Sequence, residues 1–202
     1  MSRSVFRKAA LIALGTAAIY LSGCANDNAI SQGPFTTWEN NYKRLQNLTF
    51  YKADGRLGII APDNRVSSNY ELEGISGGFV FTIKAPIIGS SLAVATVTDN
   101  TLSLSIGDKT FKDDYAAAMF EQAFGLKIPT DKLKSILLGF ADGKREYDNA
   151  GRIVKSNWDG FEISYDGVVE DSGVRVPKNI NVSYGDYKVK ATIADFSPKQ
   201  SI

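Results

Sequence analysis

Hydrophobic and polar positions alternate along the chain between residues 49 and 111, and again between residues 144 and 196. A period of two is typical of strands with one buried face, and short runs of Gly, Pro, Asn and Asp between the segments favour turns. Each connection is short enough for a hairpin, so strands adjacent in sequence should pair in the sheet. The predicted strands span residues 51–60, 65–73, 78–85, 91–98, 101–106, 109–111, 144–148, 152–158, 161–167, 178–184 and 187–196.

Three other segments have apolar residues at spacings of three and four, which predicts helices. In the first, residues 37–47, an apolar stripe begins at Trp38 and runs to Leu48, and Thr36 or Thr37 serves as N-cap. Its mixed charges favour packing on the folded domain. The alternative is a helix that lies on a membrane surface.

The second predicted helix begins at Asp113 and Asp114 and ends at Gly125, and a shorter third helix lies between Pro129 and Gly139. Both are apolar enough to pack on a sheet. A sheet of ten or eleven antiparallel strands curls, and helices between its halves are well placed to cover its open mouth or fill its lumen. The pattern therefore predicts an α+β, mainly β, fold.

Residues 21–24, Leu-Ser-Gly-Cys, end an N-terminal stretch in which basic residues precede an uncharged apolar run. This order is typical of an export signal, and the run is too short to span a bilayer. The ending resembles the bacterial lipobox, in which the cysteine, here Cys24, is acylated and becomes the new N-terminus. The alternative is a free buried cysteine. We expect a signal peptide at residues 1–23, a flexible tether at 24–36 and one domain at 37–202.

The amino-acid composition excludes several classes of partner, catalytic site and metal site. The chain has 23 basic and 22 acidic residues, and the mature part is slightly acidic once the three basic residues of the signal are removed. This balance gives no reason to expect a nucleic-acid partner. There is no histidine, and Cys24 is the only cysteine, which excludes disulfides, Ser-His-Asp catalysis and His-ligated metals. We therefore predict no catalytic residues, no metal and no cofactor.

Carboxylate, Lys or Tyr chemistry remains possible for an enzyme, and a carboxylate enzyme is the alternative that we consider. Asp113, Asp114 and Asp131 form the most obvious acidic set. Each lies where a helix is predicted to start, and an acidic side chain at a helix N-terminus is stabilising without any catalytic role. A cleft containing two of these acids with raised pKa values would favour an enzyme.

Short motifs occur in a characteristic order along nearly the whole mature chain. They are Trp38 with Leu45-Gln46-Asn47-Leu48, Gly55-Arg56-Leu57-Gly58-Ile59, Ala85-Pro86-Ile87-Ile88-Gly89-Ser90, Gly125-Leu126-Lys127-Ile128-Pro129, Leu133, Leu138-Gly139, Gly151-Arg152-Ile153, Trp158, Tyr165 and Val176-Pro177. With the lipobox, this order resembles the LolB family, whose members receive lipoproteins from the periplasmic carrier LolA. The chain differs in having Ile136 and Phe196 where family members often have Trp.

The resemblance implies an unclosed antiparallel β-barrel of about 11 strands, with helices that cover or fill one end. Its apolar cavity would hold acyl chains, and transfer would proceed without ATP from a LolA-like carrier to the acceptor and on to outer-membrane lipid. The protein would be a monomer in the outer membrane, anchored by lipid and facing the periplasm, and Ala25 after the anchor agrees with export outward. The alternative is a structural or adaptor lipoprotein with a packed core that binds a protein partner.

Two sets of site residues follow. By resemblance, Ile87 or Ile88 is the exposed apolar side chain that delivers cargo to the membrane, and two isoleucines in a turn are otherwise out of place. The alternative is that one of them packs under the sheet. For the cavity, we select apolar positions on the strands and helices. They are Leu57, Ile59, Phe79, Phe81, Ile83, Leu92, Val94, Leu104, Met119, Phe120, Leu133 and Leu137.

Overall fold

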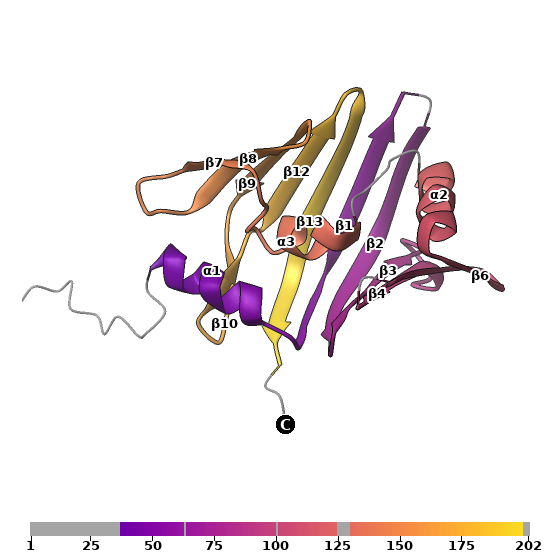
Figure 1. Ribbon diagram of the computed structural model, residues 1–202, viewed down its shortest axis with the longest axis horizontal. Coiled ribbons are helices and arrows are strands. Elements are labelled where there is room, and N and C mark those ends of the chain that lie inside the picture. The colour runs from indigo at the N-terminus through magenta and orange to yellow at the C-terminus, as the bar shows by residue number, and fades with distance from the viewer. Residues whose placement is uncertain (1–36, 63, 100, 125–129, 200–202) are drawn as a thin grey trace, which may run out of the picture. The chain divides into compact units, whose positions relative to one another are not determined.

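One large antiparallel sheet dominates the computed structural model of the protein, which describes residues 37–62, 64–99, 101–124 and 130–199. The strands of this sheet are β1 (Tyr51–Ala61), β2 (Asn64–Ile75), β3 (Gly78–Lys84), β4 (Ser91–Thr98), β5 (Thr101–Ile106), β6 (Lys109–Lys112), β7 (Lys144–Tyr147), β8 (Ile153–Trp158), β9 (Phe161–Asp166), β12 (Asn179–Tyr184) and β13 (Tyr187–Pro198). Figure 1 shows how strongly the sheet twists from one edge to the other.

The strand order is β6-β5-β4-β3-β2-β1-β13-β12-β9-β8-β7. Most strands adjacent in sequence pair as hairpins, β9 pairs with β12, and the first and last strands, β1 and β13, pair with each other. β6 and β7 lie at the two ends of this order and do not pair with each other within the described residues. The prediction of an unclosed antiparallel fold with about 11 strands and three helices is therefore confirmed.

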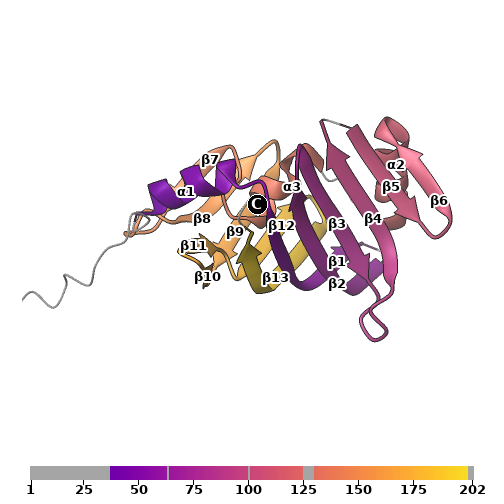
Figure 2. The same ribbon diagram turned by 90° about the horizontal axis from the view of Figure 1, so that it is seen from below.

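The helical elements are α1 (Trp38–Asn47), α2 (Asp113–Phe124), the 3₁₀ turn η1 (Thr130–Lys132) and α3 (Leu133–Leu137). Figures 1 and 2 show α3 crossing the middle strands, with α1 toward the β7–β9 edge and α2 beside β5 and β6. Residues on alternate strand positions pack against these helices and form the core. Within the described residues, no helix is long and apolar enough to cross a bilayer.

The sequence pattern predicted the position of α1 correctly but did not predict one hairpin. Thr37 is the N-cap of α1, and its side-chain oxygen accepts a hydrogen bond from the Asn40 N–H. The missed hairpin pairs β10 (Val169–Asp171) with β11 (Val174–Val176) through a two-residue turn at Ser172 and Gly173, both with positive φ. Strands of three residues are too short for an alternating pattern to emerge.

Asn41 anchors α1 to this hairpin. Its side chain is fully buried, its Nδ2 donates to the Arg175 carbonyl oxygen at 2.8 Å, and its Oδ1 accepts from the Arg175 N–H at 2.8 Å. The Arg175 guanidinium lies 4.4 Å from the centroid of the Trp38 ring on the same helix. The apolar stripe thus packs on the domain, as predicted.

We expect Asn41→Ala to lower the free energy of unfolding by about 2 kcal/mol, because two partly buried backbone groups of Arg175 lose their partner. Urea denaturation of the protein in a nonionic detergent measures this change. Asn40→Ala is the matched control, since Asn40 is exposed on the same helix and its change should stay within about 0.5 kcal/mol. Equal effects at the two positions would show that the buried hydrogen bonds are not what holds α1.

Candidate functional site

A wholly apolar pocket lies between the sheet and the helices. Five strands, together with α2 and α3, supply its wall. The lining residues are Leu57, Ile59, Phe81, Phe120, Leu133, Ile136, Leu137, Phe161, Ile180, Val182, Val189 and Ala191. These side chains define what we call the apolar pocket.

The alternation of the strands explains why these residues converge. Leu57 and Ile59 of β1 are two apart and therefore share a face, as do Val189 and Ala191 of β13. The β1–β13 register places Leu57 opposite Ala191 and Ile59 opposite Val189. The small Ala191 leaves room on the sheet at the point where α3 approaches it.

The pocket is nearly closed. Its volume is about 40 Å³, room for roughly three water molecules and far less than an acyl chain. Leu133, Ile136 and Leu137 of α3 are each at most 9% exposed and occupy much of the space above β1. We call residues 130–137, which comprise η1 and α3, the plug.

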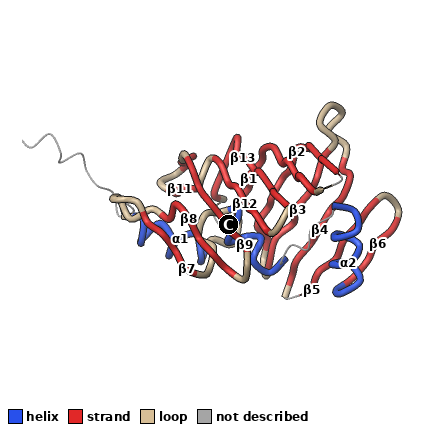
Figure 3. Tube along the Cα trace, turned by 90° about the horizontal axis from the view of Figure 1, so that it is seen from above, coloured by secondary structure: helices blue, strands red, loops and turns tan. Residues whose placement is uncertain are grey.

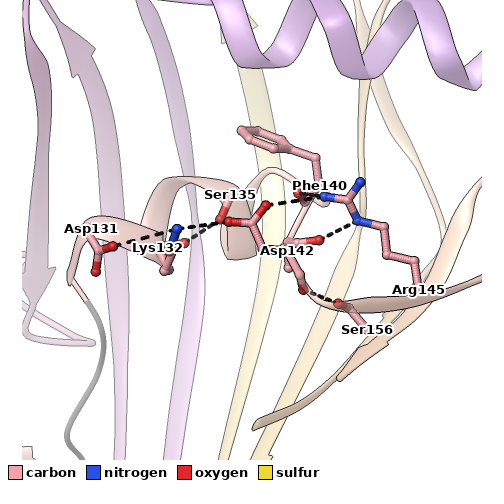
Figure 4. A network of polar contacts seen from close by, with 8 residues as sticks. Asp131, Lys132, Ser135, Phe140, Asp142, Arg145 and Ser156 are labelled. Atoms are coloured by element: carbon pink, nitrogen blue, oxygen red, sulfur yellow. Dashed lines mark hydrogen bonds and ion pairs between the residues drawn. The ribbon is translucent and has the colours of Figure 1, made fainter. Parts of the chain in front are cut away.

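Polar contacts hold the plug against the β7–β8 edge of the sheet, as Figure 4 shows. Lys132 Nζ lies 2.9 Å from Asp142 Oδ2, and this hydrogen bond raises the pKa of Lys132. Arg145 Nη2 lies 3.5 Å from Asp142 Oδ1, and the Ser156 hydroxyl donates to the Asp142 carbonyl oxygen. The ion pairs are partly exposed, so each contributes at most about 1 kcal/mol.

Lys134 ties the other side of the plug to the end of α1. Its ammonium donates to the Leu48 carbonyl oxygen at 2.8 Å and to the Gln46 carbonyl oxygen at 3.4 Å. It also lies 5.7 Å from the centroid of the Tyr51 ring. Burial lowers the pKa of Lys134, so this attachment uses a partly desolvated cation. The plug is held by several weak polar contacts at its ends and by apolar contacts in its middle.

The loop between β3 and β4 carries the two isoleucines that the sequence singled out. Ile87 is 97% exposed and Ile88 is 78% exposed. The Ala85 N–H donates to the Ser90 carbonyl oxygen at 2.8 Å, and the Gly89 N–H donates to the Ala85 carbonyl oxygen at 3.1 Å, which closes the base of the loop. Figures 2 and 3 show this loop projecting away from the sheet. Neither isoleucine packs under the sheet.

The structure brings together half of the residues selected for the cavity. Those on the wall of the apolar pocket are Leu57, Ile59, Phe81, Phe120, Leu133 and Leu137. Phe79, Ile83 and Leu104 are buried in the same core away from the pocket, and Met119 packs against that core.

Leu92 and Val94 require a correction. Ala93 and Ala95 are the buried residues of β4, so Leu92 and Val94 point to the opposite face, where Leu92 is 47% exposed. Both faces of this strand contain apolar residues, since Val97 packs against the core on the same face as Ala93 and Ala95. Alternation separates the two faces of β4 but does not show which of them is the inner face.

Sequence reasoning also missed the contribution of the C-terminal strands. Phe161, Ile180, Val182, Val189 and Ala191 all line the pocket. The alternation of Ile180 with Val182 was visible in the sequence. The sequence does not show that β1 pairs with β13. This pairing brings the C-terminal half of the chain beside the first strands.

The other candidate positions lie apart from the pocket. Asp113 and Asp114 are in the first turn of α2, and Asp131 in η1 is 3.8 Å from Lys132. Within the described residues, no group of three metal-ligating side chains comes together. Cys24, the signal peptide and the tether lie outside the described residues.

Comparisons with known proteins agree with this geometry. The family model described as outer membrane lipoprotein LolB matches residues 49–195. The outer-membrane lipoprotein LolB of Pseudoalteromonas translucida is 25% identical over 88% of this chain and 89% of its own length. That of Pseudomonas paraeruginosa is 25% identical over 94% of this chain and 97% of its own length.

The fold has a solved counterpart. A LolA superfamily protein from Nitrosomonas europaea, known from its crystal structure, superposes with a TM-score of 0.51 at 10% identity. The superposition covers 82% of this chain and 95% of that protein. Because the family model spans most of the sequence and the fold agrees with it, the chain belongs to the LolB family of outer-membrane lipoproteins.

Proposed function

We propose that this protein accepts acylated lipoproteins from a LolA-like periplasmic carrier and inserts them into the outer membrane. Its family supports a receptor in lipoprotein transport rather than an enzyme. In this proposal, Cys24 carries the lipid anchor, residues 1–23 are removed as a signal, residues 24–36 tether the domain at 37–202, and the domain acts as a monomer.

The observation that supports this proposal most directly is the apolar pocket and its plug. Every lining residue is apolar, so the site suits a hydrocarbon chain and has nothing to offer a polar substrate. Each buried methylene contributes about 0.8 kcal/mol, so an acyl chain that crosses water must be shielded throughout. Entry of a chain requires the plug to move off β1 and β13.

Displacement of the plug is physically reasonable. An incoming chain replaces the contacts of Leu133, Ile136 and Leu137 with contacts of the same chemical kind, so the apolar free energy nearly balances. The remaining attachments are the partly exposed ion pair of Lys132 and the hydrogen bonds of Lys134. Transfer can therefore run on differences in affinity for the acyl chains, without nucleotide.

The small volume of the pocket favours a second candidate function. A core with about 40 Å³ of free space is also what a structural or adaptor lipoprotein would have. Such a protein would bind the folded part of its partner and would not bind acyl chains. The presence or absence of acyl chains on the cargo distinguishes the two functions.

We expect the purified protein to take an acylated lipoprotein from a LolA-like carrier in buffer that contains no ATP. Size-exclusion chromatography after mixing should show at least tenfold less cargo with the carrier when this protein is present. Cargo that lacks acyl chains is the matched control and should not move. Ala191→Leu places a larger side chain in the pocket. This variant should take less cargo from the carrier, because the added side chain fills part of the pocket volume.

Two outcomes would contradict this function. Strict dependence on ATP would exclude passive transfer. Equal acceptance of acylated and non-acylated cargo would favour the adaptor, because an adaptor would recognise only the folded part of the cargo.

A further inference from the structure

Two buried hydroxyls on β2 lie beside the apolar pocket. Ser68 is 2% exposed and Tyr70 is 1% exposed. Neither hydroxyl oxygen has a hydrogen-bond partner among the residues that the structure describes. Both side chains belong to the buried face of the strand, since they are two residues apart.

Pairing in the sheet fixes where these hydroxyls lie relative to the pocket. The β1–β2 register places Ser68 directly opposite Leu57, so their side chains are neighbours on one face. The Tyr70 ring packs on the Phe81 ring of β3, with 5.6 Å between centroids. Leu57 of β1 and Phe81 of β3 both line the pocket, and β2 lies between these two strands, so Ser68 and Tyr70 adjoin the pocket wall.

An unpartnered buried hydroxyl is unfavourable. Removing a polar group from water without a hydrogen bond destabilises the folded protein, and buried polar groups are normally paired. Ser68→Ala or Tyr70→Phe would avoid this penalty with little change in shape. Burial also raises the pKa of Tyr70, so its hydroxyl remains protonated and able to donate.

A ligand that meets these donors must combine three properties. It must contain a hydrocarbon chain, because the adjoining pocket is apolar. It must offer a hydrogen-bond acceptor, because neither hydroxyl has one among the described residues. It must be uncharged at that acceptor, because an ionised group would be strongly penalised by this environment. The carbonyl oxygen of an ester- or amide-linked acyl chain has all three properties.

We propose that Ser68 and Tyr70 donate hydrogen bonds to acyl carbonyl oxygens when the plug moves and a chain enters the pocket. This inference rests on the proposed function, since it assumes that acyl chains occupy the site. It adds a selection rule: the receptor distinguishes a carbonyl-linked chain from a plain alkyl chain of equal length.

A pair of synthetic lipopeptides tests the rule. One carries two ester-linked sixteen-carbon chains, and the other carries two ether-linked chains of the same length. We expect the full-length protein in detergent to bind the ester form about tenfold more tightly, which corresponds to about 1.4 kcal/mol. In the double variant Ser68→Ala and Tyr70→Phe, the ratio should fall to about one, while the affinity for the ether form stays unchanged.

Thermal unfolding supplies a second measurement that is independent of ligand. Tyr70→Phe should raise the Tm of the unliganded protein, because it removes an unpaired buried hydroxyl. Tyr42→Phe is the matched control. The Tyr42 hydroxyl accepts a hydrogen bond from the Ile153 N–H at 2.7 Å, so its loss should lower the Tm and leave the ester-to-ether ratio at about ten.

The outcomes separate this inference from the proposed function. Equal binding of the two lipopeptides by the unmodified protein, or an unchanged ratio in the double variant, overturns the role of the hydroxyls and leaves acyl binding intact. A fall in Tm for Tyr70→Phe also overturns it, because the hydroxyl would then have a structural partner such as a buried water. Failure to bind either lipopeptide overturns the proposed function itself.

Discussion

Replacing Gly55 with alanine should lower the free energy of unfolding by about 3 kcal/mol or more. Gly55 lies in β1 at the point where the register against β13 shifts. A Cβ added there would overlap with the carbonyl oxygen of Thr192. The overlapping atom belongs to backbone, so no side-chain rotation can relieve it.

The shift in register explains why the two strands approach so closely. Asp54 pairs with Asp195 and Gly55 pairs with Ile193, so Ala194 is an extra residue on β13. A bulge of this kind bends the strand and increases its twist. Relief of the overlap would require β1 and β13 to separate, and this pairing joins the two halves of the sheet.

Gly58→Ala is the matched control for Gly55→Ala. Gly58 lies three residues further along β1, and a Cβ there would meet the Lys190 carbonyl oxygen at 3.9 Å, an ordinary contact. We expect it to change the stability by less than about 0.5 kcal/mol. Urea denaturation of both variants in detergent measures the difference. Similar losses at the two positions would mean that strand propensity, and not backbone overlap, governs the effect.

Hairpin chemistry and alternation predicted most of this fold, and the reasons are local. The Asp159–Gly160 turn between β8 and β9 and the Gly185–Asp186 turn between β12 and β13 are two-residue connections that dictate antiparallel neighbours. Thr37 provided a cap that defines the start of α1. Each of these features depends on residues close together in sequence, which is why a single chain suffices to predict them.

The candidate site was harder to predict, because it depends on contacts between distant residues. Leu57 meets Ala191 only through the β1–β13 pairing, and Ile136 meets both only because the plug packs over that junction. Alternation assigns residues to two faces but does not say which face is inner. On β4, the selected Leu92 and Val94 lie on the face opposite to the buried Ala93 and Ala95. Nothing in the sequence pattern predicts that the hydroxyls of Ser68 and Tyr70 are buried without a hydrogen-bond partner among the described residues.

Changing both Ile87 and Ile88 to Glu should slow insertion of cargo into the membrane at least tenfold, while transfer from the carrier to this protein stays within twofold of its original rate. The two side chains are 97% and 78% exposed on a closed loop that projects from the sheet. Exposed apolar residues of this size favour contact with an apolar surface, and the bilayer is the surface nearest to an outer-membrane lipoprotein.

The magnitude follows from the difference between the side chains in a membrane. Isoleucine enters the apolar region favourably, whereas an acidic residue there is unfavourable by up to about 3 kcal/mol. Even if the loop reaches only the interface and half of this penalty applies, the cost is about 1.5 kcal/mol, which is slightly more than tenfold. The folded domain should be unaffected, because neither isoleucine contributes to the core.

Two further variants isolate the role of the loop. Tyr115→Glu adds a negative charge at another exposed apolar residue, 64% exposed on α2, and should leave the insertion rate unchanged. The double variant Ile87→Leu and Ile88→Leu keeps the apolar character and should insert cargo normally. A time course of cargo transfer into liposomes gives all three rates. The loop of the glutamate variant should have no affinity for lipid. If this variant nevertheless inserted cargo as fast as the leucine variant, delivery would have to proceed through another surface.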